Sequence, residues 1–344
     1  MSNPGTTSST GGNRMETKKA SATSRMKLQA GAMQKLLAFG GLIFLIIIFS
    51  ILSPNFFRFN NIVSIILATC VNGVLAFGVT FVIITSGIDL SVGTTMTLSA
   101  VMAGVFITNA GLPVWVGVIG GILTGSAIGV VNGFMISRMK LPPFIATLGM
   151  MMATKGLSLV ISGTKPIYFE TENGFSNIAM GSLLNDIIPG FTIPNAVIVL
   201  IIAAIIAALV LSKTILGRYT FALGSNEEAT RLSGVNTANW KMIVYTVCGT
   251  FAGVAGVLMA SRLNSAQPAL GAGYEMDAIA ASVIGGASLA GGEGGIVGTI
   301  IGAFIISTLT NGLRIMSVPQ EWQTVVTGLI VVLAVYSDMA RKRK

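Results

Sequence analysis

The chain consists largely of long apolar segments joined by short polar ones. A bilayer core about 30 Å thick is crossed by roughly 20 apolar residues in a helix, and only helices and closed barrels satisfy their backbone hydrogen bonds there. Only 10% of the residues are charged, whereas soluble domains carry about 25%. The sequence therefore predicts an all-α fold, a polytopic membrane helix bundle of about ten transmembrane helices, some of them short or broken. The expected spans are residues 36–53, 62–85, 93–109, 114–137, 144–162, 195–212, 241–261, 276–290, 295–315 and 322–338.

The distribution of basic residues predicts the orientation of these spans. With an even number of spans both termini share one side, and that side carries most of the 21 Lys and Arg residues, including the flexible basic tails 1–35 and 339–344. Because loops rich in Lys and Arg stay in the cytoplasm, we expect both termini there. The apolar transmembrane domain then spans 36–338, with a cytoplasmic loop at 213–240 and an extracytoplasmic loop at 163–194. The net charge of +9 follows this topology, and no nucleic-acid partner is expected.

Several kinds of chemistry are disfavoured by residues that the sequence lacks. It contains no histidine, the most frequent general base and metal ligand. Cys70 and Cys248 both fall in expected spans and indicate neither a disulfide framework nor a metal site. No phosphate-binding loop with a Gly-Lys-Ser/Thr ending occurs, so any ATP used by this protein must bind to another chain. We therefore expect that this chain is not an enzyme. We also expect it to have no catalytic residues, no metal and no cofactor.

A polar and charged segment, Gly217–Asn236, interrupts the apolar pattern. Ser225 or Asn226 can cap the start of a helix, and Gly234 can end it. These signals predict a short helix of about eight residues between two spans. One interpretation is a docking element for a soluble motor protein, since the chain has no ATP site of its own. The alternative is an ordinary connecting loop with a turn of helix.

Asp89 lies in the segment Thr85–Gly93, where one expected span ends and the next begins. Two glycines and two serines surround this carboxylate, which indicates an unwound or sharply turned backbone. In one interpretation Asp89 accepts hydrogen bonds from a polar substrate or gates its path. In the other it caps the helix that starts near Ser91.

Two runs of glycine recur at every fourth position. In a helix each run lies along one face and allows close approach of another backbone, so both runs predict helix packing. They are Gly117, Gly121, Gly125, Gly129 and Gly133 in one span, and Gly294, Gly298 and Gly302 in another.

Several longer motifs occur in the order found in one transporter family. They are Ser53–Phe57, Thr85–Gly93, Pro143–Leu148, Leu216–Tyr219, Ala222–Gly234, Ser265–Pro268, Gly273–Ala280 and Gly285–Gly292. On these motifs, and from about Leu36 to Asp338, the chain resembles the ribose-type permeases of ABC importers. The resemblance implies a permease subunit of the bacterial inner membrane that forms the translocation pathway for a sugar. The sugar expected first is a ribose-like monosaccharide.

The same resemblance implies partners. Two permease copies, expected as a homodimer in membrane lipid, would form the pathway. Cassette ATPase subunits would bind ATP and Mg on the cytoplasmic side, and a periplasmic or surface-tethered sugar-binding protein would deliver the substrate. Asn226–Gly234 would then be the coupling helix. The expected ATPase-coupling residues are Gly224, Asn226, Glu227, Ala229, Arg231, Leu232, Ser233 and Gly234.

A path for sugars requires hydrogen-bonding side chains rather than buried charges, because sugars are neutral and rich in hydroxyl groups. The expected pathway residues in or near the spans are Asn72, Ser86, Asp89, Ser91, Asn132, Phe144, Thr147 and Ser288, with Phe144 as an apolar face. The alternative function is a self-sufficient secondary transporter or channel for a small polar solute. That alternative needs intramembrane carboxylates for ion coupling, and Asp89 is nearly the only central one.

Overall fold

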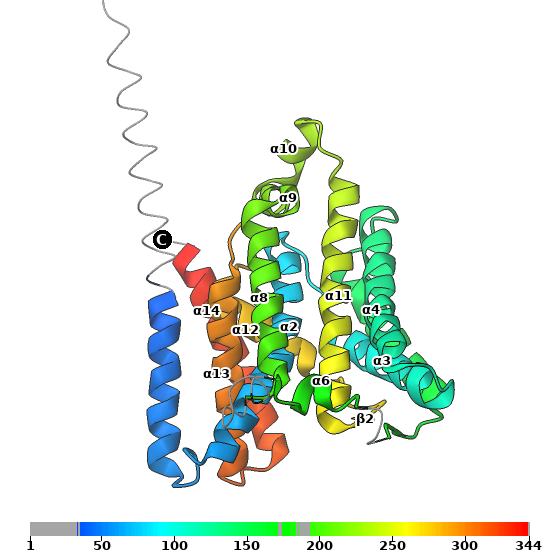
Figure 1. Cartoon of the computed structure of the whole chain (residues 1–344). Coiled ribbons are helices and arrows are strands. Elements are labelled where there is room, and N and C mark those ends of the chain that lie inside the picture. The colour runs from blue at the N-terminus through cyan, green and yellow to red at the C-terminus, as the bar shows by residue number, and fades with distance from the viewer. Residues whose placement is uncertain (1–32, 34, 171–173, 184, 186–192, 343–344) are drawn as a thin grey trace, which may run out of the picture.

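The computed structural model describes residues 33, 35–170, 174–183, 185 and 193–342, and it is a helix bundle with one pair of very short strands (Figure 1). The all-α prediction is confirmed. Most of the predicted tail 1–35, part of the predicted loop 163–194 and the end of the tail 339–344 lie outside the described residues. The helices in chain order are Lys35–Leu52, α2 (Phe59–Ile84), α3 (Val92–Gly104) with a π-helical turn at Val105–Asn109, α4 (Val114–Ser137), α5 (Pro143–Ser162), α6 (Asn177–Met180), α8 (Asn195–Lys213), α9 (Ile215–Ser225), α10 (Glu227–Leu232), α11 (Thr237–Leu263), α12 (Tyr274–Ile284), α13 (Ile296–Ile315) and α14 (Gln320–Lys342).

Eight of the described helices are long and apolar enough to cross a bilayer, and they account for eight of the ten expected spans. The other two expected spans are also helical. α12 has 11 residues, which is about 16 Å of helix and too short to cross a bilayer alone. α14 has 23 residues and a more polar sequence that begins with Gln320 and Glu321. A bundle with some short spans is therefore confirmed.

Proline and left-handed residues mark the ends of the helices. Pro113, Pro142 and Pro194 directly precede α4, α5 and α8, where a missing N–H costs nothing because the first turn of a helix has no acceptor for it. Gly163 and Asn264 follow α5 and α11 in the left-handed conformation that commonly ends a helix. Local chemistry thus sets these boundaries within the long apolar stretches.

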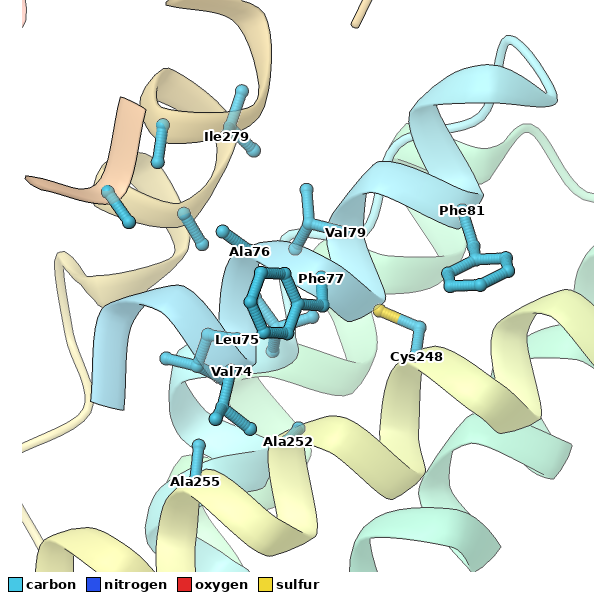
Figure 2. Close-up of a cluster of buried hydrophobic side chains, with 14 of the residues drawn as sticks. Val74, Leu75, Ala76, Phe77, Val79, Phe81, Cys248, Ala252, Ala255 and Ile279 are labelled. Carbon is cyan, nitrogen blue, oxygen red and sulfur yellow. The ribbon is translucent and has the colours of Figure 1, made fainter. Parts of the chain in front are cut away.

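The core is centred on α2, in which every residue from Thr69 to Ile84 is buried. Figure 2 shows side chains of α2 between Cys248, Ala252 and Ala255 of α11 and Ile279 of α12. A helix that is apolar on all sides is stable only when other helices surround it or lipid does. Here α8, α11, α12 and α13 surround α2, which makes it the central element of the bundle.

The first glycine run, and Gly298 and Gly302 of the second, lie where two helices meet, as predicted, whereas Gly294 lies before the start of α13. A Cβ on Gly125 would overlap the carbonyl oxygen of Gly249 in α11, and one on Gly129 would lie 2.9 Å from the Cα of Thr246. On the other side of the bundle, a Cβ on Gly298 would overlap the carbonyl of Gly285. The backbones of α4 and α11 are therefore in direct contact, and no larger residue fits at these positions.

The two ends of the bundle differ. α9 and α10 lie at one end, which is the top of Figure 1, and the described chain also begins and ends there. α6 and the strand pair lie at the other end. In that pair β1 (Ile167–Tyr168) runs antiparallel to β2 (Ser265–Ala266).

Candidate functional site

The polar segment singled out by the sequence forms a capped helix, α10. The side-chain oxygen of Asn226 accepts a hydrogen bond from the backbone N–H of Ala229 at 2.9 Å, so Asn226 is the start cap. Gly234 follows the helix with φ of +84°, a conformation that glycine adopts without strain. Both predicted end signals are confirmed, but α10 has six residues rather than about eight.

A second helix, α9, precedes α10 and was not predicted. Its buried residues are Gly217, Thr220 and Leu223, which recur every third position and form one face of the helix. The spacing of these three residues is present in the sequence, but the polar residues between them hide it as a helical pattern. The predicted loop 213–240 is therefore mostly helical.

Gly224, near the end of α9, packs directly on the end of α2. A Cβ there would overlap the carbonyl oxygen of Ile84 and would lie 2.5 Å from the backbone nitrogen of Gly292. The Ile84 carbonyl in turn accepts a hydrogen bond from Gly292 N–H at 2.8 Å. Ser86 donates from its hydroxyl to the carbonyls of Gly224 and Ala290, at 3.4 and 2.9 Å. The ends of α2 and α9 and the glycine-rich turn after α12 thus meet at one place, which we call the α9 joint.

Two side-chain contacts hold α9 and α10 against the first turns of α11. The Lys241 ammonium group lies 2.6 Å from a carboxylate oxygen of Glu227. The rings of Tyr219 and Trp240 are 4.8 Å apart between their centroids. α9, α10 and the start of α11 therefore form one connected unit.

One face of α10 is exposed. Thr230 faces inward, whereas Glu228, Ala229, Arg231 and Leu232 face outward, and Leu232 is 75% exposed. Arg231 and Glu228 form an ion pair at 2.6 Å, and the hydrogen bond from Arg231 lowers the pKa of the Glu228 carboxyl below its ordinary value. The exposed face of α10 therefore presents an ion pair and one apolar side chain.

Asp89 is 2% exposed and belongs to a buried polar cluster. Its Oδ1 accepts hydrogen bonds from the backbone N–H and the hydroxyl of Ser91, at 2.9 and 2.7 Å. Asn132 donates from Nδ2 to the Ser91 hydroxyl at 2.8 Å and lies 3.4 Å from Asp89 Oδ2. These contacts fix the turn that leads into α3, but Asp89 bonds Ser91 just before the helix, and no side chain caps the first turn of α3 itself. Three of the expected pathway residues meet here, on α4 and on the α2–α3 turn.

The other expected pathway residues are spread over the molecule. Asn72, Thr147 and Ser288 are buried, whereas Ser86 and Phe144 are exposed. Asn72 Nδ2 lies 3.5 Å from the Ser307 hydroxyl, and the Thr147 hydroxyl donates to the backbone of its own helix. Ser86 and Ser288 come together at the glycine-rich turn of the α9 joint, where the Ser288 hydroxyl accepts from Ala290 N–H at 3.3 Å. Within the described part of a single chain, the eight residues do not share one surface.

The described residues contain no group of three His, Cys, Asp or Glu side chains placed to hold a metal ion. Cys70 and Cys248 are free thiols, and both are buried. Neither thiol therefore lies on the molecular surface as a reactive group.

The apolar helices, together with the capped helix pair at one end, define a multi-pass helical membrane protein. The chain belongs to the family described as "Branched-chain amino acid transport system / permease component", whose profile matches residues 61–335. It is therefore a transport permease, a multi-pass protein of the bacterial inner membrane.

Curated relatives cover most of the chain. It is 43% identical to the ribose import permease protein RbsC of Escherichia coli (strain K12), over 86% of this chain and 91% of the relative. It is 42% identical to the ribose import permease protein RbsC of Bacillus subtilis (strain 168), over 90% and 94%. The fructose import permease protein FrcC of Rhizobium meliloti is 36% identical, over 84% and 80%. No solved structure matches the chain.

Proposed function

We propose that this chain is the permease subunit of an ABC importer and forms the translocation pathway for a ribose-like monosaccharide. The observation that carries the proposal is its identity of 42–43% with two ribose import permeases, over more than nine tenths of their length. Relatives at 34–36% identity are named for D-allose, fructose and xylose. All these substrates are monosaccharides, so the substrate class extends beyond ribose itself.

The energy for import comes from a separate cassette ATPase, which binds ATP and Mg. The sequence supports this assignment, because it has no phosphate-binding loop of the Gly-Lys-Ser/Thr type. A sugar-binding protein delivers the substrate to the opposite side. A second copy of the chain completes the pathway, and lipid covers the apolar outer faces of the bundle.

α10 is the coupling helix in this proposal. Its exposed face docks on the ATPase, and the α9 joint carries the movement to α2 and to the turn after α12. The coupling residues are the eight expected from the sequence, from Gly224 to Gly234. The basic residues Lys213, Arg218 and Arg231 belong to this end of the bundle and support its cytoplasmic orientation, as do the basic termini.

A reconstitution experiment tests the function. The chain is inserted in liposomes together with its ATPase, and radiolabelled ribose is supplied with the sugar-binding protein. We expect uptake that requires ATP and the binding protein. Uptake by the chain alone, driven by an ion gradient, would instead establish a secondary transporter.

A charge reversal tests the role of α10. Arg231→Glu removes the ion pair with Glu228 and reverses the charge of the exposed face, so we expect ATP hydrolysis without matching uptake. Arg231→Lys keeps the charge and serves as the matched control. Normal uptake per ATP in the Arg231→Glu variant would exclude α10 as the coupling helix.

A further inference from the structure

An apolar groove runs along the membrane-spanning part of the bundle, between α8 and α11, which lie side by side (Figure 1). It extends from Val199 to Val210 on α8 and from Val247 to Val254 on α11, and its volume is about 360 Å³. The rise from Val199 to Val210 is about 16 Å, roughly half of the hydrocarbon core of a bilayer. The groove therefore has the length that the acyl chains of one leaflet occupy.

The lining of this α8–α11 groove disfavours a polar occupant. Its side chains are all hydrocarbon except that of Thr250. The Thr250 hydroxyl donates to the carbonyl oxygen of Thr246 at 2.8 Å and lies 2.8 Å from the Ser126 hydroxyl, so its hydrogen bonds are already made within the chain. Water or a sugar would lose hydrogen bonds in such a space, whereas a hydrocarbon chain has none to lose.

The groove is also too narrow for a protein helix. Its volume, spread over about 16 Å, gives a mean cross-section of about 20 Å². A helix with its side chains is about 10–12 Å across, which corresponds to roughly 80–110 Å². The floor is held in place from behind, because the ring of Phe251 lies 6.2 and 6.4 Å from the rings of Phe77 and Phe81 in α2, measured between centroids. The shape therefore fits a single hydrocarbon chain.

At one end, near Val199, the short helix α6 joins the two walls of the groove. α6 contacts both α8 and α11. Asn195 of α8 donates from Nδ2 to the carbonyl oxygen of Asn177 at 2.8 Å, and the Ser261 hydroxyl of α11 accepts from the backbone N–H of Ala179 at 2.9 Å. Because protein occupies this end, a lipid in the groove must have its headgroup at the other end.

The other end carries cations and aromatic rings. Lys213 continues the groove-lining face of α8 one turn beyond Val210, and Arg218 follows on α9. Both side chains are exposed, and neither pairs with a carboxylate among the described residues. Trp240 lies two turns before the groove on the same face of α11, with its ring beside that of Tyr219. Tryptophan, tyrosine and lysine at the end of an apolar face are typical of the level of lipid headgroups.

We propose that the α8–α11 groove binds one acyl chain of an anionic phospholipid, whose phosphate lies at Lys213 and Arg218. Unpaired cations beside an apolar groove complement a negative headgroup with a hydrocarbon tail. In the proposed orientation this end faces the cytoplasmic leaflet, which carries anionic lipids. The inference defines one lipid site within the general lipid coat, and it depends on neither the transported sugar nor the ATPase.

The test uses the purified chain in nanodiscs of phosphatidylcholine. These nanodiscs contain a trace of phosphatidylglycerol with a photoreactive diazirine in the middle of one acyl chain. Illumination attaches this lipid to the residues that it contacts, and mass spectrometry of the peptides locates them. We expect labelling to concentrate in residues 199–210 and 247–254. Unlabelled phosphatidylglycerol should remove this labelling, although phosphatidylcholine is already present in large excess.

A pair of variants tests the site of the acyl chain. Ile206→Trp adds bulk at a position that lines the groove and should reduce its labelling. Ile205→Trp is the matched control, because Ile205 is the neighbouring residue outside the groove and is 53% exposed, against 51% for Ile206. It should leave the labelling unchanged. Thermal melting in detergent checks that each variant is folded.

A second pair of variants tests the site of the headgroup. Each cation near the membrane surface contributes about fivefold to the binding of an anionic lipid. Lys213→Gln combined with Arg218→Gln should therefore raise the concentration of phosphatidylglycerol that gives half-maximal labelling by about 30-fold. Lys213→Arg combined with Arg218→Lys keeps both charges and should label as the parent does.

Three results would overturn the inference. Labelling spread evenly over the exposed apolar helices and insensitive to unlabelled phosphatidylglycerol would show that the groove holds only bulk lipid. Labelling of the neighbouring faces but not of the groove would show that another occupant, such as part of a second copy of the chain, fills it. Equal half-maximal concentrations in the two charge variants would exclude Lys213 and Arg218 as the headgroup site. The assay uses neither ATP nor sugar, so its failure and the failure of the proposed function are distinguishable.

Discussion

Replacement of Gly224 by alanine probes the α9 joint with a single added methyl group. That methyl would overlap the Ile84 carbonyl oxygen and lie 2.5 Å from the backbone nitrogen of Gly292, whereas real Cβ contacts keep at least 3.0 Å. The joint must therefore open, and the hydrogen bond of 2.8 Å from Gly292 to Ile84 is lost or stretched.

The cost of this change follows from two contributions. Overpacking at a close contact costs about 1–3 kcal/mol, and the hydrogen bond contributes about 0.5–1.5 kcal/mol. A combined loss of about 2–4 kcal/mol would shift the equilibrium of the joint toward its open form by about 30- to 1,000-fold. The rest of the helix bundle is expected to stay folded, because the hydrophobic core around α2 does not depend on the contact between Gly224 and Ile84.

Two measurements on the reconstituted importer check the prediction. We expect the Gly224→Ala variant to hydrolyse ATP with reduced sugar uptake per ATP. We also expect faster hydrogen exchange in α9 and α10. Gly40→Ala is the matched control, since a Cβ at Gly40 meets nothing within 4 Å and alanine is favoured over glycine in a helix by about 1 kcal/mol. Unchanged coupling and unchanged exchange in the Gly224→Ala variant would refute the joint as a transmission point.

Three further changes test local parts of the structure. Asn226→Ala removes the cap of α10 and should weaken that helix by about 1 kcal/mol, seen as about fivefold faster exchange of its amides; exchange equal to the parent would contradict the cap. Asp89→Ala leaves the buried Ser91 donors without an acceptor and should lower the free energy of unfolding by about 1–3 kcal/mol, whereas Asp89→Asn keeps an acceptor oxygen and should melt closer to the parent in detergent. Arg231→Gln should raise the pKa of Glu228 toward its ordinary value in an NMR titration. Because the folded pKa is lowered, this ion pair contributes above the ordinary pKa of the carboxyl and is lost as pH falls through the lowered value.

The bundle was predictable from sequence because the bilayer itself selects the length and polarity of each span. The pathway residues stay a prediction, and the hydroxyl groups show why residue type alone does not identify them. The Thr147 hydroxyl donates to the carbonyl oxygen of Pro143, four residues earlier in its own helix. Serine and threonine satisfy themselves in this way inside apolar helices, so residue type alone does not separate a pathway wall from a packed interface.

The α9 joint was beyond sequence reasoning for a different reason. Gly224 and Gly292 come from segments far apart in the chain, and each reads locally as an ordinary turn or cap residue. Their close approach to Ile84 depends on how three helices assemble. By contrast, the cap at Asn226 and the stop at Gly234 depend only on adjacent residues, and both were predicted.

The glycine contact between α4 and α11 has a mechanical consequence. α11 starts at Thr237, a few residues after α10, and its 27 residues extend for about 40 Å. With no side chains between the facing backbones at Gly125 and Gly249, the two helices have no compliant layer that would let one slide past the other. If α10 is the coupling helix as proposed, a movement of α10 would be passed along α11, and α4 would be expected to move with it.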